Sequence, residues 1–299
     1  MVESLDTWLD QAAQQRETGN LVRRRRLLRP IDAVRVHDGT RPLLNFSGND
    51  YLGLAGHPEV AAAAVASLSS GFSGAGASAL VTGYRSEHQA LENQLAEFLE
   101  REAVVLFSSG FLANLAVACS LAGRHDFIVQ DRLCHASLID GARLSGARLL
   151  RYAHADSAAA ARQLARVEHG NALLVTDGVF SMDGDVAPLK DLAGICRQVG
   201  AWMVVDDAHG LGVTGPGGRG VLASAGLGQD EVPVLVGTLG KACGSAGAFV
   251  AGSRPLVNHL VNEARSYIYT TAMPPAVAAA GLAGLRRLVE DDWRRNKLR

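Results

Sequence analysis

Apolar residues follow two rhythms along this chain. Short runs rich in Val, Leu and Ile predict buried strands, and longer stretches with an apolar residue every three or four positions predict helices. We expect strands at residues 103–107, 127–130, 148–152, 172–176, 202–205 and 234–236. Helices are expected between them, from the turn at 108, from 131–137 through 144, and over 158–168 and 188–199. This alternation predicts an α/β fold in three layers, a doubly wound, mainly parallel sheet with helices on both faces.

The regions on either side of these strands have other patterns. They predict a polar helix at 3–29, a short strand and turn at 41–54, an alanine-rich helix opening at His57-Pro58, an irregular glycine-rich stretch at 71–84 and a helix at 88–102. Towards the other end they predict a helix from 252 to 263, an extended linker at 267–275 and a long helix at 276–289. The match to GxGxxG at 215–220 contains a proline and opens no helix, so we interpret it as a loop.

Charge and cysteine content narrow the possible classes of function. The formal net charge of 299 residues is -1 and the pI is about 6.8, so no overall field favours nucleic acid or an anionic membrane. The four cysteines are scattered, without zinc spacing, which is typical of a reducing cytoplasm. Three acidic residues in the first ten argue against a signal peptide, and no apolar run approaches a membrane span. We expect a cytoplasmic protein.

Polar residues that could perform chemistry follow the predicted strands directly. They are Asp177, Ser181, Asp206, His209, Thr238 and Lys241. The carboxyl ends of parallel strands meet at one edge of the sheet, where ligands bind in folds of this class. The pattern therefore predicts a ligand site at this edge.

Lys241 lies in the glycine-rich turn of Gly237-Thr-Leu-Gly-Lys241, between two apolar runs. Burial would lower its pKa, and a neutral amine can form a Schiff base with a carbonyl cofactor such as pyridoxal phosphate. An ordinary surface lysine is the alternative, and the glycine spacing does not fit a phosphate-binding P-loop. Asp206 could keep the cofactor's ring nitrogen protonated, although a turn cap or a metal site is also possible. No other carboxylate or histidine pair has ligand spacing, which argues against a metal.

Two segments could bind anions. The helix that opens after residue 108 presents backbone N–H groups and its dipole to a phosphate, unless this is an ordinary helix cap. Arg23 to Arg26 form a basic cluster, and such a run is usually a solvated face. The alternative is a site for a substrate carboxylate or phosphate.

Several stretches together resemble the α-oxoamine synthases, which are fold-type I pyridoxal phosphate enzymes. The matching stretches are residues 44–54, 131–138, 177–185, 205–210, 237–241 and 269–275. The resemblance implies three parts: an N-terminal arm with the start of a small domain (1–43), a large cofactor-binding domain (44–275), and a linker helix with the start of a C-terminal domain (276–299). It also implies that family members continue into a C-terminal domain, which supplies an arginine for the amino acid carboxylate. These 299 residues are therefore expected to bind the cofactor but to condense substrates poorly or not at all.

The resemblance also implies roles for individual residues. Lys241 would carry the cofactor and act as the base, Asp206 would pair with the ring nitrogen, and His135 would stack on the ring and contact substrate. The remaining positions implied to touch the cofactor are Gly110, Phe111, Ser181, His209, Thr238, Thr270 and Thr271. Asn49 and Arg23 match substrate-binding positions, which raises the anion hypothesis for Arg23.

The activity implied is a decarboxylative condensation of L-alanine with a pimeloyl thioester, which gives 8-amino-7-oxononanoate, CO2 and a free thiol in biotin biosynthesis. The alternative within the family condenses glycine with an acetyl thioester. A different class of alternative is a protein that binds the cofactor without turnover. Thr270 and Thr271 match a segment that reaches the partner subunit's phosphate, so the resemblance implies a homodimer.

Overall fold

A computed structural model of the chain describes residues 3–298 and divides it into two compact units, Met1–Ser47 and Gly48–Arg299. The first unit contains helix α1 (Leu5–Thr18) and a small antiparallel sheet. The sheet strands, in spatial order, are β1 (Arg29–Pro30), β2 (Arg35–His37) and β3 (Pro42–Leu44). The predicted division of the chain after residues 43 and 275 stays a prediction.

The predicted helix over 3–29 is wrong beyond Thr18. Gly19 caps the helix, Asn20 takes a left-handed φ of 53°, and the Leu21 amide donates back to the carbonyl of Arg16 at 2.8 Å. These contacts satisfy carbonyls of the last turn and end the helix, as a glycine and an asparagine at this place favour. The cluster Arg23 to Arg26 therefore lies in an exposed, non-helical segment.

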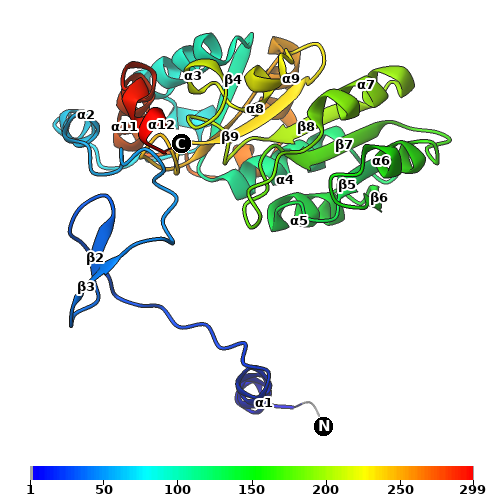
Figure 1. The fold of residues 1–299 in the computed structure, drawn as a ribbon. Helices are drawn as coiled ribbons and strands as arrows, with labels where there is room; N and C mark the ends of the chain where they lie inside the picture. Colours follow the sequence, from blue (N-terminus) through cyan, green and yellow to red (C-terminus); the bar gives the residue numbers. More distant parts are fainter. Residues whose placement is uncertain (1–2, 299) are drawn as a thin grey trace. The chain divides into compact units, whose positions relative to one another are not determined.

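The second unit is built on a seven-stranded sheet (Figure 1). Its strands, in spatial order, are β4 (Ala103–Phe107), β10 (Ala248–Gly252), β9 (Val234–Thr238), β8 (Trp202–Asp206), β7 (Ala172–Asp177), β5 (Phe127–Asp131) and β6 (Arg148–Tyr152). Only β10 runs antiparallel to its two neighbours among these described strands. The predicted mainly parallel sheet is confirmed.

Helices cover both faces of this sheet. Buried residues on one face come from α3 (Ser86–Leu99), α6 (Ser157–Leu164), α7 (Leu189–Val199), α8 (Val221–Ala225) and α11 (Pro275–Glu290). Those on the other face come from α4 (Gly110–Leu121), α5 (Ala136–Leu144), α9 (Arg254–Glu263) and α10 (Arg265–Ile268). Strand residues alternate between the two cores. In β8, for example, Met203 and Val205 face one core and Val204 faces the other. Successive side chains of a strand point to opposite faces, so both faces of β8 are packed against apolar residues.

The remaining elements of this unit are short or peripheral. They are α2 (Pro58–Leu68), a π-helical turn at Ala79–Gly83, a 3-10 turn at Pro216–Gly218 and α12 (Asp292–Leu298). The predicted extended linker at 267–275 is wrong at its start, because α10 includes Tyr267, whose buried ring packs edge-on against Phe107. Within residues 3–298, no helix combines the length and the apolar character needed to cross a membrane.

Candidate active site

Parallel strands of the large sheet deliver polar residues to one edge. Asp177 is the last residue of β7, and the strand register places it directly beside Asp206, the last residue of β8. Thr238 ends β9, and Lys241 lies in the turn that follows. His135 lies beyond β5, where it is the N-cap residue of α5. The structure thus brings together side chains that are more than 100 residues apart in sequence.

The turn that carries Lys241 packs directly on another segment of the same unit. The Gly244 amide donates to the Lys241 carbonyl at 3.0 Å, and Gly244 has a left-handed φ of 66°. A Cβ at Gly244 would lie 2.3 Å from the carbonyl carbon of Leu54, so only glycine allows this approach. The close packing places Lys241 beside the segment that contains Asn49 and Tyr51.

A chain of hydrogen bonds leads outward from Lys241. Its Nζ lies 2.8 Å from Nε2 of His209, and Nδ1 of His209 lies 2.7 Å from the Tyr51 hydroxyl. That hydroxyl lies 3.4 Å from Oδ1 of Asn49. Every group is satisfied when Lys241 donates to Nε2, Nδ1–H donates to Tyr51 and the Tyr51 hydroxyl donates to Asn49.

Burial lowers the pKa of both basic groups. It lowers the pKa of Lys241 below its ordinary value, although the charges of Asp206, Asp177 and Asp207 act in the opposite direction. Burial, and secondly the charge of Lys241, lower the pKa of His209 to about 4. His209 is therefore neutral at pH 7 and can accept a hydrogen bond, which leaves the Lys241 amine available as a nucleophile or base.

Asp206 is held by a second network on the other side of the site. Its Oδ2 accepts a hydrogen bond from Nδ2 of Asn114 at 2.7 Å, and its Oδ1 accepts one from the Ala208 amide at 3.0 Å. The same Nδ2 of Asn114 lies 2.8 Å from the Ser137 hydroxyl, which is 2.7 Å from Nδ1 of His135. Asn114 and Ser137 are fully buried, so this network fixes the Asp206 carboxylate and links it to the ring of His135.

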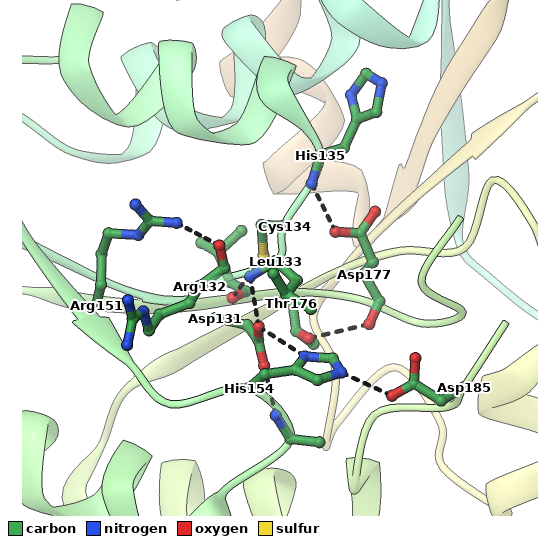
Figure 2. Close-up of polar contacts among 12 residues, drawn as sticks. Asp131, Arg132, Leu133, Cys134, His135, Arg151, His154, Thr176, Asp177 and Asp185 are labelled. Atoms are coloured by element: carbon green, nitrogen blue, oxygen red, sulfur yellow. Dashed lines mark hydrogen bonds and ion pairs between the residues drawn. The ribbon is translucent and has the colours of Figure 1, made fainter. Parts of the chain in front are cut away.

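Two further acids lie beside Asp206. Burial, and secondly the charge of Asp206, raise the pKa of Asp177 to about 7, while its Oδ2 accepts from the His135 amide at 2.9 Å (Figure 2). Burial raises the pKa of Asp207 to about 8, although the Val221 amide donates to its Oδ2 at 2.9 Å. At pH 7 Asp207 therefore keeps its proton and Asp177 is about half protonated, so a buried cluster of three full negative charges is avoided.

The start of α4 offers an anion site near the end of β4. Ser109 caps this helix by accepting from the Leu112 amide at 3.3 Å, and Gly110 and Phe111 form its first turn. Open space surrounds the position where Gly110 would carry a Cβ. The Thr238 hydroxyl donates to the Gly247 carbonyl at 2.9 Å and accepts from the Gly240 amide at 3.2 Å, which fixes the turn before Lys241.

The other predicted positions have fewer contacts. Ser181 is exposed in the loop after β7 and makes no hydrogen bond among residues 3–298. Thr270 and Thr271 line a small pocket together with Ser108. Arg23 is exposed in the first unit. The roles of these four residues stay predictions.

Residues that support this site were missed in the sequence. Asn114 lies inside an apolar helix and Ser137 follows a helix cap, so neither stands out by pattern. Tyr51 lies in the turn that contains Asn49, yet only the fold shows that its hydroxyl meets His209. Within the described residues, no group of three histidine, cysteine or acidic side chains has the geometry to hold a metal ion.

The site combines four groups. They are the amine of Lys241, the fixed carboxylate of Asp206, the exposed imidazole of His135 and the start of α4. An amine of lowered pKa can bond to a carbonyl group, and a fixed carboxylate can hold a proton on a ring nitrogen. The helix start can bind a phosphate. This set of groups fits pyridoxal phosphate and chemistry at the α-carbon of an amino acid.

Comparisons with known proteins agree with this chemistry. An 8-amino-7-oxononanoate synthase of Methylococcus capsulatus is 55% identical over 270 residues, which are 90% of this chain and 70% of that protein. A solved structure of SPT with a PLP internal aldimine has a TM-score of 0.93 at 29% identity and covers 99% of this chain and 76% of that chain. The 8-amino-7-oxononanoate synthase from Francisella tularensis has a TM-score of 0.73 at 35% identity, over 84% and 71% of the two chains.

A family model places the chain within a broader group. The model described as aminotransferase class I and II matches residues 41–298, which is most of the chain. The matched range contains all seven strands of the large sheet and every candidate residue of the second unit. The chain belongs to the aminotransferase class I and II family.

Proposed function

We propose that the chain is a pyridoxal phosphate-dependent acyltransferase of biotin biosynthesis. It condenses L-alanine with a pimeloyl thioester, and the products are 8-amino-7-oxononanoate, CO2 and the free thiol. The observation that carries this proposal is the similarity to the Methylococcus capsulatus synthase, which covers 90% of this chain at 55% identity. The site supports the class of chemistry, and the similarity selects the substrates.

The residues present fit the cofactor. Lys241 is half-buried with a lowered pKa, so its amine can bond to the carbonyl group of the cofactor. Asp206 offers a buried carboxylate that Asn114 and Ala208 hold by hydrogen bonds, which suits a partner for the ring nitrogen. Gly110 and Phe111 offer the N–H groups of an uncrowded helix start to the phosphate, beside Thr238. His135 would stack on the ring, and Ser181 and His209 would lie near its hydroxyl oxygen.

Bound pyridoxal phosphate supplies an electron sink that stabilises the negative charge left when the α-proton of an amino acid is removed. Lys241 would be the base in this scheme, because burial lowers its pKa, whereas a pKa of about 4 makes neighbouring His209 a much weaker base. The bond to neutral His209 orients that amine, and Tyr51 in turn fixes the ring of His209. Asn114 keeps the Asp206 carboxylate in place throughout.

Substrate binding would extend outward from this centre. Asn49 lies at the outer end of the hydrogen-bond chain from Lys241, so it can contact an acyl group that approaches the amine. Arg23 would pair with the distal carboxylate of the pimeloyl chain, because a guanidinium binds a carboxylate in bidentate fashion. This role for Arg23 rests on the resemblance of its position.

The proposed assembly is a homodimer in which Thr270 and Thr271 contact the phosphate in the partner subunit. In support, Tyr269, in the same segment, exposes 72% of its surface, and an exposed aromatic ring is typical of residues that partners cover. We also propose a cytoplasmic location, which the four unpaired cysteines support.

A substrate matrix tests the proposed reaction. Alanine and glycine are each offered with pimeloyl-CoA and acetyl-CoA, and release of free thiol is measured with CO2. We expect the highest kcat/KM for alanine with pimeloyl-CoA. A higher value for glycine with acetyl-CoA would contradict the proposed substrates and assign the chain to the glycine-using branch.

A further inference from the structure

His154 lies between two carboxylates close to the candidate site, and the proposed mechanism does not use it. His154 follows β6, and its Nδ1 lies 3.0 Å from Oδ1 of Asp131, at the end of β5. Its Nε2 lies 2.8 Å from Oδ2 of Asp185, in the loop between β7 and α7 (Figure 2). The ring therefore bridges two segments that arrive from different strands of the sheet.

The hydrogen-bond partners determine the charge of this ring. Asp131 is buried and also accepts from the Leu133 amide and the Ala155 amide, each at 2.8 Å, so every group around it is a donor. An ionised carboxylate accepts only, and a neutral imidazole has one N–H. Both ring nitrogens can donate to a carboxylate only when the ring carries two protons.

Each end of this bridge leads to a residue of the candidate site. Asp131 accepts from Leu133, which begins the turn to His135, and the His135 amide donates to Asp177. Asp185 lies in the loop of residues 178–187, which also contains Ser181. Beyond the bond to His154, the Asp185 carboxyl makes no hydrogen bond among the described residues, and its Oδ1 is buried without a partner.

The backbone around His154 is held in an uncommon conformation for this contact. Ala155 has a left-handed φ of 53°, which a residue with a Cβ adopts at a cost of about 1 kcal/mol. Its amide donates to Asp131 in that conformation. The ring itself lies edge-on to buried Phe180, at 4.4 Å between ring centroids, so its orientation is fixed from the side of the 178–187 loop as well.

We infer that His154 is a positioning residue, which as an imidazolium ties Asp131 to Asp185 and so holds the turn before His135 against the loop that contains Ser181. This inference rests on the proposed function, because His135 and Ser181 matter only as contacts of the cofactor. We call the set Asp131, His154 and Asp185 the carboxylate bridge.

The surroundings determine how the carboxylate bridge responds to pH. The charged groups that face the ring are Asp131 from β5 and Asp185 from the loop, while Tyr152 and Cys134 lie near Asp131 and are neutral because burial raises the pKa of each. Arg132 and Arg151 lie near Asp131 in Figure 2, where Arg151 bonds to the Arg132 carbonyl and not to the ring. Burial alone would lower the pKa of His154, but the two carboxylates outweigh it and raise the pKa.

The raised pKa of His154 determines how the stability of the carboxylate bridge changes with pH. A histidine with a raised pKa in the folded state stabilises that state at low pH, and the stabilisation is lost as pH rises through the folded pKa. The carboxylate bridge should therefore hold the loop below the folded pKa of His154 and release it as the pH rises through that pKa. Loss of the second proton of the His154 ring leaves one ring nitrogen unable to donate a hydrogen bond. The bond to Asp185, which is partly exposed, should therefore open before the bond to buried Asp131.

The test uses the full chain with 15N-labelled histidine, four variants and two measurements. NMR reports the protonation of both ring nitrogens, and the loss of one of nine histidine signals in His154→Gln assigns the resonance. Hydrogen exchange reports the loop through amides of Phe180, Gly184 and Ala187, which form its internal hydrogen bonds. Asp185→Asn removes one of the two negative charges beside the ring, and Asp183→Asn is the matched control, because Asp183 is exposed in the same loop and makes no hydrogen bond or ion pair with His154 among the described residues.

We expect two protons on the wild-type ring at neutral pH, with a titration midpoint that falls in Asp185→Asn and is unchanged in Asp183→Asn. Loop protection factors, which correct each rate for the intrinsic base catalysis of amide exchange, should fall roughly tenfold in His154→Gln and in wild type at high pH, as loss of one charge-assisted bond predicts. An amide at position 185 can donate to a neutral ring, so the protection factors of Asp185→Asn should lose their dependence on pH. Asp131→Asn is the fourth variant and should also lower the midpoint.

Two results would overturn the inference. One is a singly protonated ring at neutral pH or a midpoint that Asp185→Asn does not move. The other is loop exchange in His154→Gln equal to that of the Asp183→Asn control. Neither measurement depends on turnover, so a failure here is distinct from failure of the proposed reaction, which the substrate matrix measures.

Discussion

Replacing Asn114 with alanine tests how much the candidate site depends on its buried support. The Nδ2 group of Asn114 donates to the Asp206 carboxylate at 2.7 Å and lies 2.8 Å from the Ser137 hydroxyl. A bond to a charged acceptor contributes about 1.5–3 kcal/mol and a neutral one about 0.5–1.5 kcal/mol. The Oδ1 of Asn114 is buried without a partner, and its removal returns about 1–3 kcal/mol. The free energy of unfolding should therefore fall by only about 1–2 kcal/mol.

The effect on cofactor binding should be larger than this modest loss of stability. Without Asn114, the Asp206 carboxylate keeps, among the described residues, only the bond from the Ala208 amide, and it can turn away from the ring nitrogen. We expect the affinity for pyridoxal phosphate to fall roughly tenfold or more, since one charge-assisted bond no longer fixes the carboxylate. Asn114→Asp should be worse, because it places a second carboxyl group against Asp206 in a buried site.

Two assays separate these effects. Urea unfolding of the cofactor-free chain gives stability, and titration with pyridoxal phosphate, followed by its absorbance, gives affinity. Asn262→Ala is the control, because it removes an exposed asparagine that bonds only to its own helix. Cofactor affinity in Asn114→Ala within twofold of that control would refute the claim that this network positions Asp206.

Three other predictions concern stability and assembly. Asp207 has a pKa of about 8 in the folded chain and 3.8 ordinarily, so the free energy of unfolding should fall as the pH rises between these values. Asp207→Asn should make this fall smaller, as measured by urea unfolding at several pH values. A pH dependence equal to that of wild type would contradict the raised pKa. Gly244→Ala should lower the free energy of unfolding by about 2–5 kcal/mol, because the new Cβ would clash with Leu54 and the backbone has a left-handed φ. A free energy of unfolding within about 0.5 kcal/mol of wild type, which is the scatter of surface variants, would count against the packing of the Lys241 turn. Sedimentation of the cofactor-loaded chain should show a dimer, and Tyr269→Asp should weaken it; a loaded monomer would argue against the shared site.

The fold could be predicted well where local pattern decides structure. Strands such as 103–107 match the structure at both ends, because each is a short apolar run whose two faces join the two buried cores. The helix predicted over 3–29 was too long, since polar spacing alone did not show that Gly19 and Asn20 would end it. The linker at 267–275 begins as helix because the Tyr267 ring is buried, which is a tertiary contact that no local pattern contains.

The site could be predicted only in part for a similar reason. Asp206, His209 and Lys241 follow strand ends, and the topology of a parallel sheet brings such residues together. Asn114, Ser137 and Tyr51 act through contacts across 20 to more than 150 residues of sequence, and each is an ordinary polar residue in its own segment. The same holds for His154, whose role is visible only when β5, β6 and the 178–187 loop are assembled.

The central claim is that Lys241 carries the cofactor, and borohydride trapping measures this most directly. The chain has three lysines, Lys190, Lys241 and Lys297, so the labelled position is readily distinguished. The chain is incubated with pyridoxal phosphate, treated with borohydride to fix the cofactor on the amine it is bonded to, digested and mapped by mass spectrometry. We expect label on the peptide that contains Lys241, and this label should be retained in Lys190→Arg and absent in Lys241→Arg. Equal labelling of Lys190 or Lys297, or undiminished total label in Lys241→Arg, would contradict this claim.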